Sequence, residues 1–187
     1  MKRMIIVLTA VMVVSGFVLA SAYTLFLPQI QANRKAALDA SLNAIFSGAE
    51  SPSFEKLDTD QMTIYRASGG GGTTLGYAVN VTASGYGGDI QLLVGLSADL
   101  QSITGMQVVE QIETPGLGGR IQEAWFKKQF EGLDPRAQIS YVKNTEPDKE
   151  KNQIQAISGA TISSNAVVTG LNNQLEPAIQ IIKQLDK

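Results

Sequence analysis

The sequence of 187 residues contains neither cysteine nor histidine, and each absence excludes a class of chemistry. Without cysteine there is no disulfide, no cysteine-ligated iron–sulfur cluster and no thiol nucleophile. Without histidine there is no ordinary zinc site, no Ser-His-Asp triad and no imidazole proton shuttle. Metal sites made of aspartate and glutamate alone remain open, but the sequence lacks a calcium-binding loop of the EF-hand type, and we predict no metal site. We also predict no catalytic side chain. Redox chemistry in such a chain would need an organic cofactor.

Charge is absent from a long segment near the N-terminus. Met4–Leu27 holds 24 uncharged residues behind Lys2 and Arg3, and about 20 apolar residues cross a bilayer core. Ala20-Ser21-Ala22 fits a signal-peptide cleavage site, which leaves a removable signal peptide as an alternative. Because the apolar run continues past that site, we favour an uncleaved transmembrane signal anchor over residues 1–28. The positive-inside rule then places the following domain outside the cytoplasm, at the periplasmic or extracellular face of the inner membrane.

The remainder of the chain has an acidic balance. Lys2, Arg3 and Arg34 are the only charged residues among the first 34, so the rest carries 12 basic and 17 acidic groups, a net charge of −5. A nucleic-acid partner is therefore not expected, because phosphate binding needs a basic surface. About 150 residues are enough for one domain with a hydrophobic core.

Residue periodicity after the anchor predicts an α+β fold with helices packed on an antiparallel sheet. Residues 29–48, opened by Pro28, predict a stalk or first helix, and residues 49–187 the extracytoplasmic domain. The polar segment 47–56 predicts a loop. Four strand-like segments separated by glycine-rich or polar turns predict an antiparallel meander; they span residues 62–67, 75–81, 90–96 and 103–110.

The second half of the chain changes to a helical period. Ile121, Trp125, Phe126 and Phe130 fall on one side of a predicted helix that Gly132 ends. Short strands are predicted at 137–142 and 154–157, separated by a charged loop. A last helix is predicted from about Ile162, and Pro177 is expected to bend or restart it.

Two short motifs stand out between these elements. In Glu113–Gly119, Pro115 and Gly116 predict a type II turn, since the turn needs a positive φ at its second corner. The two glycines that follow, Gly118 and Gly119, would let a flat ring approach the backbone near exposed amides. The alternative is a tight connection between a strand and a helix.

The second motif is Ser158-Gly159-Ala160-Thr161, just before the last helix. In one interpretation Ser158 or Thr161 caps the helix and Gly159 makes the turn. In the other, small neighbours leave the Thr161 hydroxyl accessible for covalent modification, and a phosphate esterified there would lie at the positive end of the helix.

The signal anchor, the Gly85-Tyr86-Gly87-Gly88 turn before Ile90, E-T-P-G-L-G and S-G-A-T occur in an order and spacing that cover essentially the whole chain. Together they resemble the FMN-binding G subunits of Rnf ferredoxin:NAD⁺ oxidoreductases. They are also similar to the C subunits of Na⁺-translocating NADH:quinone reductases, which are usually longer chains.

This resemblance implies that FMN is attached through its phosphate to Thr161 by a flavin transferase that uses FAD as donor. It also implies that the transferase recognises Ser158, Gly159 and Ala160 together with Thr161. The loop that it places beside the flavin contains Glu113, Thr114, Gly116, Leu117 and Gly118. Two positions depart from the family pattern, because Gln155 stands where an aspartate is usual and Gln111 where a histidine is common.

The function implied by the resemblance is electron transfer within a membrane complex. The chain would be a non-catalytic carrier when alone, exchanging electrons with a membrane subunit that bears its own FMN, beside the other Rnf subunits. Whether the complex moves Na⁺ or H⁺ stays open. A flavin-free, membrane-anchored structural or sensory module is the alternative, and Gln155 is its best support.

Overall fold

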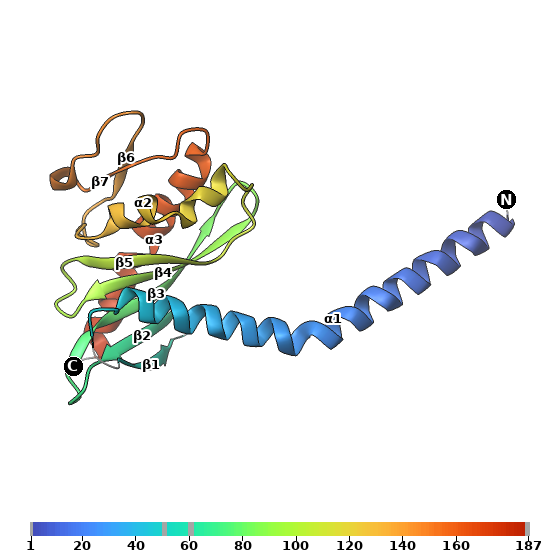
Figure 1. Ribbon diagram of the computed structural model, residues 1–187, viewed down its shortest axis with the longest axis horizontal. Coiled ribbons are helices and arrows are strands. Elements are labelled where there is room, and N and C mark those ends of the chain that lie inside the picture. The colour runs from blue at the N-terminus through green and yellow to red at the C-terminus, as the bar shows by residue number, and fades with distance from the viewer. Residues whose placement is uncertain (1, 50–51, 60–61, 186–187) are drawn as a thin grey trace. The chain divides into compact units, whose positions relative to one another are not determined.

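A computed structural model describes residues 2–49, 52–59 and 62–185 (Figure 1). Its internal contacts divide the chain into two units, Met1–Leu38 and Asp39–Lys187. Helix α1 (Lys2–Ile45) runs without interruption through Pro28 and belongs to both units. By length and composition it can cross a membrane. The boundaries expected at residues 28 and 48 stay a prediction.

The larger unit is built on a five-stranded antiparallel sheet in the order β1-β2-β3-β4-β5 (Figure 1). Its strands are β1 (Ser53–Asp58), β2 (Thr63–Ser68), β3 (Thr74–Ser84), β4 (Asp89–Ser97) and β5 (Ile103–Glu110). The predicted meander is confirmed, and the α+β class with it. Alternation decides the faces: Val79, Val81 and Val94 are fully buried on the core side.

The prediction of a loop over 47–56 is wrong in its last part. Residues from Ser53 onward form the edge strand β1, which pairs with β2 and leaves most of its side chains exposed. The segment Ser53–Asp58 lacks a clean alternation of apolar and polar residues. It becomes a strand because β2 offers it a free edge, with Leu57 opposite Ile64 in the register.

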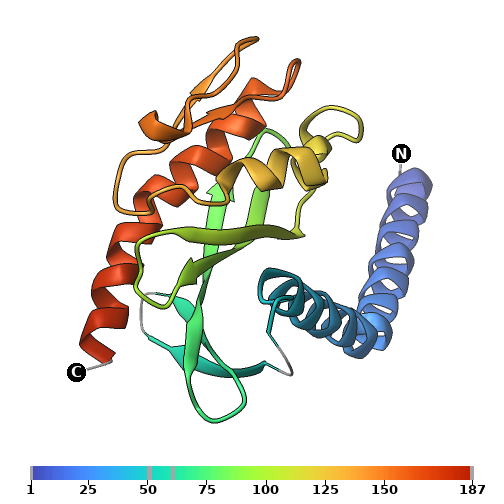
Figure 2. The same ribbon diagram turned by 60° about the vertical axis from the view of Figure 1, so that its left-hand side comes forward.

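Helix α3 (Thr161–Leu185) covers one face of the sheet (Figure 2). Val167, Leu171 and Leu175 are buried against the strands, as predicted. Gly170 lets α3 lie close to β3, since a Cβ built there would lie 2.8 Å from the Ala83 Cβ. The helix does not restart at Pro177, because this proline lies on the exposed face, where solvent can satisfy the freed carbonyl.

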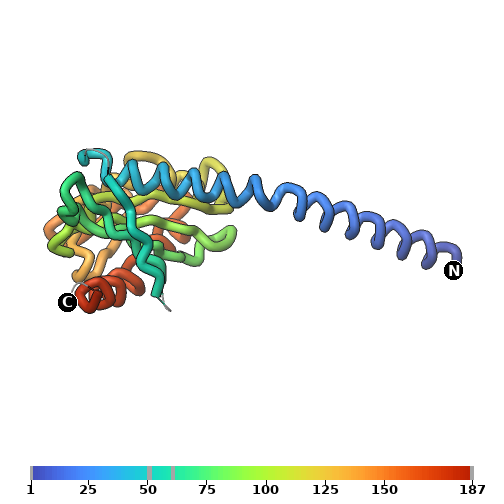
Figure 3. Tube along the Cα trace, turned by 90° about the horizontal axis from the view of Figure 1, so that it is seen from below, coloured from blue at the N-terminus to red at the C-terminus, as the bar shows by residue number. Residues whose placement is uncertain are grey.

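The opposite face of the sheet receives the C-terminal end of α1. A Cβ at Gly95 would lie 2.3 Å from Ile45 Cγ2, so the glycine makes room for this helix end. Leu42 and Phe46 are buried in the same layer. In Figure 3 the green strands lie between this part of α1 and the red helix α3.

The predicted helix over 121–130 is wrong as a single element. The structure has a 3₁₀ turn (Gly118–Gln122), the short helix α2 (Ala124–Lys127) and a second 3₁₀ turn (Lys128–Phe130). Glu123 is extended, with φ −66° and ψ 141°, and this breaks the helix. Ile121, Phe126 and Phe130 are buried as predicted, whereas Trp125 is 39% exposed.

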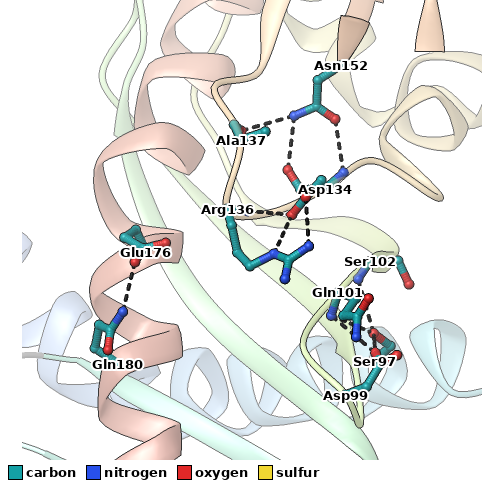
Figure 4. A network of polar contacts seen from close by, with 10 residues as sticks. All are labelled: Ser97, Asp99, Gln101, Ser102, Asp134, Arg136, Ala137, Asn152, Glu176 and Gln180. Carbon is teal, nitrogen blue, oxygen red and sulfur yellow. Dashed lines mark hydrogen bonds and ion pairs between the residues drawn. The ribbon is translucent and has the colours of Figure 1, made fainter. Parts of the chain in front are cut away.

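Two short parallel strands, β6 (Ser140–Val142) and β7 (Gln153–Gln155), complete the fold beside the start of α3 (Figure 1). Both are shorter than predicted. A polar network holds residues 134–137, which precede β6, against Asn152, which precedes β7 (Figure 4). Asn152 is buried, in the left-handed region at φ 55°, and its side chain bonds the Asp134 N–H at 2.9 Å and the Ala137 carbonyl at 3.0 Å. Arg136 donates two 2.9 Å hydrogen bonds to the Asp134 carboxylate, and these hold the pKa of Asp134 below its usual value.

Candidate functional site

A cavity of about 460 Å³ lies where the β3–β4 turn, the loop after β5 and the start of α3 meet. Its volume is within the roughly 300–1,000 Å³ of small-molecule sites. The lining residues are Tyr86, Glu113, Thr114, Leu117, Gly118, Gly159, Ala160, Thr161, Ile162 and Ser163. The two sequence motifs, which are far apart in the chain, therefore meet at one cavity. Of the predicted site residues, Gly116 and Ser158 are not among those that line it.

The predicted turn at Pro115 and Gly116 is present. The Leu117 N–H donates to the Thr114 carbonyl at 3.1 Å, and Gly116 has the positive φ of 75° that a type II turn needs. The same Thr114 carbonyl accepts from the Gly119 N–H at 3.0 Å. These local hydrogen bonds form the turn, which presents Leu117 to the cavity.

Glu113 joins the three walls of the cavity. Its side chain is only 4% exposed. Oε1 accepts from the Gly87 N–H of the β3–β4 turn at 2.7 Å, and Oε2 accepts from the Ser163 hydroxyl in the first turn of α3. Hydrogen bonds to a charged group are worth roughly 1.5–3 kcal/mol each. The carboxylate therefore holds together segments that are 26 and 50 residues away in sequence.

Two different requirements explain the glycines of the motifs. Gly118 is required for space, because a Cβ there would lie 2.3 Å from Glu113 Oε2 and 2.4 Å from Ser163 Oγ. Gly159 is required for its backbone conformation, since its φ is 81° while the nearest neighbour of an added Cβ would be Leu117 at an ordinary 3.6 Å.

The start of α3 decides between the two interpretations of the cap. The Ala160 carbonyl accepts from the Ser164 N–H at 3.1 Å, so alanine occupies the cap position and offers no side chain to the first amides. The prediction that Ser158 or Thr161 caps the helix is wrong. Ser164 supports the preceding turn instead, because its hydroxyl accepts from the Ile157 N–H at 2.9 Å.

Thr161 is the first residue of α3 and is partly exposed at the cavity. Within the described part of the chain, none of the hydrogen bonds uses its hydroxyl. A negative group bonded to this oxygen would lie beside uncapped helix amides, which favour anions.

Tyr86 and Ile162 also line the cavity, although neither is among the predicted site residues. Tyr86 is 74% exposed, Ile162 58% and Leu117 49%, so the mouth of the cavity is apolar. The signal for Tyr86 was present in the sequence, as an aromatic residue set between glycines at the tip of a turn.

Of the two residues that depart from the family pattern, Gln111 forms a hydrogen bond through its side chain and Gln155 forms hydrogen bonds through its backbone. The Gln111 side-chain oxygen accepts from the backbone N–H of Glu113 and so supports the loop. Gln155 lies in β7, and its backbone N–H donates to Gln129 Oε1 at 2.6 Å. Gln155 is not among the residues that line the cavity.

Comparison with known proteins identifies the family. Residues 85–176 match the FMN-binding domain. The G subunit of the proton-translocating ferredoxin:NAD⁺ oxidoreductase complex of Clostridium ljungdahlii is 30% identical over 169 residues, covering 90% of this chain and 86% of that protein. The chain belongs to the G-subunit family of ion-translocating oxidoreductases.

Other members and structures are similar over shorter spans. The G subunit of the Na⁺-translocating ferredoxin:NAD⁺ oxidoreductase complex of Acetobacterium woodii is 40% identical over 117 residues, which cover 62% of this chain but only about half, 53%, of that protein. The crystal structure of the C subunit of the Na⁺-translocating NADH-quinone reductase from Parabacteroides distasonis superposes with a TM-score of 0.55 at 22% identity, covering 68% of this chain and 74% of that one. At this identity the likeness concerns the fold.

The residues that line the cavity of the present chain fit FMN. The apolar mouth suits a flat ring system, and the uncapped start of α3 suits a phosphate. No cluster of acidic side chains that could hold a metal ion occurs in the described ranges 2–49, 52–59 and 62–185.

Proposed function

We propose that this protein is the membrane-anchored electron-transfer subunit of an Rnf-type ferredoxin:NAD⁺ oxidoreductase, carrying FMN covalently on Thr161. The observation that carries the proposal is the meeting of the two motifs at one cavity, which the partly exposed Thr161 lines at the start of α3. Membership of the G-subunit family supports the assignment to this kind of complex.

The attachment is a phosphoryl-type transfer from FAD by a flavin transferase. The Thr161 oxygen bonds to the phosphorus on the FMN side of the FAD pyrophosphate, and the bond from that phosphorus to the bridging oxygen breaks. AMP leaves, and the hydroxyl proton is released. The product phosphodiester keeps one negative charge at the positive end of α3, where it is stabilised by about 0.3–1 kcal/mol at an exposed site.

The protein's residues would bind and orient the cofactor rather than take part in the redox step. Bound FMN supplies the acceptance and donation of electrons. Thr161 would tether it. Glu113 would hold the β3–β4 turn, its own loop and the start of α3 together, and Gly118 leaves the space that the Glu113 carboxylate needs. No proton donor or acceptor of the histidine or cysteine type is available or required.

Helix α1 would anchor the domain in the inner membrane. Its apolar length suffices to cross the bilayer, and Lys2 and Arg3 favour a cytoplasmic N-terminus. The domain then lies on the periplasmic or extracellular side, next to an FMN-bearing membrane subunit and the other subunits of the complex.

One second function is supported by a specific residue. Gln155 replaces the aspartate that is usual before the S-G-A-T sequence, and a transferase that needs the acid would leave the protein unmodified. The chain would then be a flavin-free structural or sensory module. An equivalent place in a Na⁺-translocating NADH:quinone reductase is a variant of the first proposal.

Intact mass spectrometry of the full chain, coexpressed with an active flavin transferase, separates these functions. Wild type should gain one FMN-sized increment that peptide mapping places on Thr161. Thr161→Ala should lose it, and Thr161→Ser should keep part of it. Thr169→Ala, on the exposed face of the same helix, is the matched control and should be modified like wild type. An exported wild-type protein without the increment would overturn the flavin proposal and favour the flavin-free module.

A further inference from the structure

Tyr86 has a large aromatic side chain that is exposed to solvent and is not part of the hydrophobic core. It is 74% exposed at the tip of the turn between β3 and β4. None of the hydrogen bonds within the described residues involves its hydroxyl. Beyond α1, six large apolar side chains of the described chain are exposed, and three of them, Tyr86, Leu117 and Ile162, line the same cavity.

The backbone that carries Tyr86 is held firmly although the side chain is not covered. The Gly85 N–H donates to the Gly88 carbonyl at 2.8 Å, which closes the turn. The next residue, Gly87, donates its N–H to the buried Glu113 carboxylate at 2.7 Å. A Cβ at Gly87 would lie 2.6 Å from the Ile112 carbonyl, so the turn is packed closely on the loop. The backbone on both sides of Tyr86 is therefore held in place, while its side chain extends into solvent.

The other walls of the cavity present aliphatic side chains. Leu117 comes from the loop after β5, and Ile162 from the first turn of α3. Thr161, which directly precedes Ile162 in α3, lines the same cavity. One aromatic and two aliphatic side chains around a tethering hydroxyl match a flat, conjugated ligand, because aromatic faces prefer offset stacking on other π systems.

We propose that Tyr86 is a positioning residue that stacks on the isoalloxazine ring of the flavin and shields one face of it from solvent. This inference rests on the proposed attachment of FMN to Thr161. Leu117 and Ile162 contact the ring through their aliphatic side chains. The stacked phenol is electron-rich, so it quenches the fluorescence of the excited flavin, whereas aliphatic neighbours do not.

The test compares full-length flavinylated variants of Tyr86 in detergent, each checked by intact mass. Tyr86→Phe keeps a stacking face and removes the phenol, so flavin fluorescence should rise while acrylamide quenching stays at the wild-type level. Tyr86→Ala removes both, so fluorescence should rise and the acrylamide quenching constant should increase by about twofold or more. Leu185→Ala is the matched control: this residue is also exposed, at 47%, and it lies at the C-terminal end of α3, outside the cavity lining, so both readings should stay at the wild-type level.

The outcomes separate the two proposals. Absence of the FMN mass increment in the wild-type protein overturns the proposed function, and with it the role of Tyr86. A full FMN increment on wild type and on Tyr86→Phe, with unchanged fluorescence, overturns the stacking role alone. Equal acrylamide access in flavinylated Tyr86→Ala and wild type does the same. Since Tyr86 is exposed at a turn tip, neither substitution removes a core contact that folding needs.

Discussion

Adding a single methyl group at Gly118 should damage the domain far more than adding one at the neighbouring glycine. A Cβ at Gly118 would lie 2.3 Å from Glu113 Oε2 and 2.4 Å from Ser163 Oγ. At Gly119 the nearest atom is the Thr114 carbonyl oxygen, at 3.4 Å, and neither glycine has a positive φ. Gly118→Ala and Gly119→Ala therefore differ in the space available for the added methyl group, whereas neither introduces the backbone strain of a positive φ.

The magnitude follows from what Gly118→Ala displaces. Overpacking a filled site costs about 1–3 kcal/mol, and parting Glu113 from Ser163 removes a hydrogen bond to a charged group worth roughly 1.5–3 kcal/mol. Because the two partners can share the displacement, we expect a loss of about 2–4 kcal/mol in the free energy of unfolding. Gly119→Ala should change it by no more than about 0.5 kcal/mol, as surface substitutions usually do.

Urea unfolding of the full chain in detergent measures the difference. The single tryptophan, Trp125, lies in α2 and reports the domain without interference from α1. Equal unfolding free energies for Gly118→Ala and wild type would refute the packing argument, as would an equal loss in both glycine variants. In flavinylated protein, Gly118→Ala should also alter the flavin absorbance, because Gly118 lines the cavity. A less stable variant with an unchanged flavin spectrum would leave this loop a purely structural role.

Three further predictions concern other parts of the domain. Gln155→Asp should leave flavinylation by the transferase equal or raise it, as measured by the fraction of FMN-modified mass, and a fall would contradict the recognition argument. Gly170→Val should destabilise the domain by about 2 kcal/mol or more in urea, because its Cβ would lie 2.8 Å from that of Ala83 and overpack α3 against β3. Asp134→Asn should lower stability at neutral pH. The carboxylate, whose folded pKa is held below 3.8 by Arg136, contributes fully above that value and loses its contribution as pH falls through the folded pKa. The gap between Asp134→Asn and wild type should therefore close in acid, and a gap that widens there would contradict the role of this pair.

Several elements were predictable because their determinants are local. The strands from β2 to β5 follow from short apolar segments between glycine-rich turns, and the turn at Gly116 from a backbone preference of two adjacent residues. Strand β1 and the break at Glu123 were not predictable in this way. Strand β1 depends on the free edge of β2. The break at Glu123 depends on the packing of the Phe126 and Phe130 side chains in the core.

The sequence by itself determined which chemistries are excluded, the apolar length of α1, and the presence of two motifs that resemble an FMN attachment site. These depend on composition and on neighbouring residues. Only the tertiary structure decided that the motifs meet at one cavity, that alanine rather than a hydroxyl residue occupies the cap position of α3, and that Glu113 bonds both Gly87 and Ser163. Such contacts join residues far apart in the chain, and their geometry exists only once the sheet and α3 have packed together.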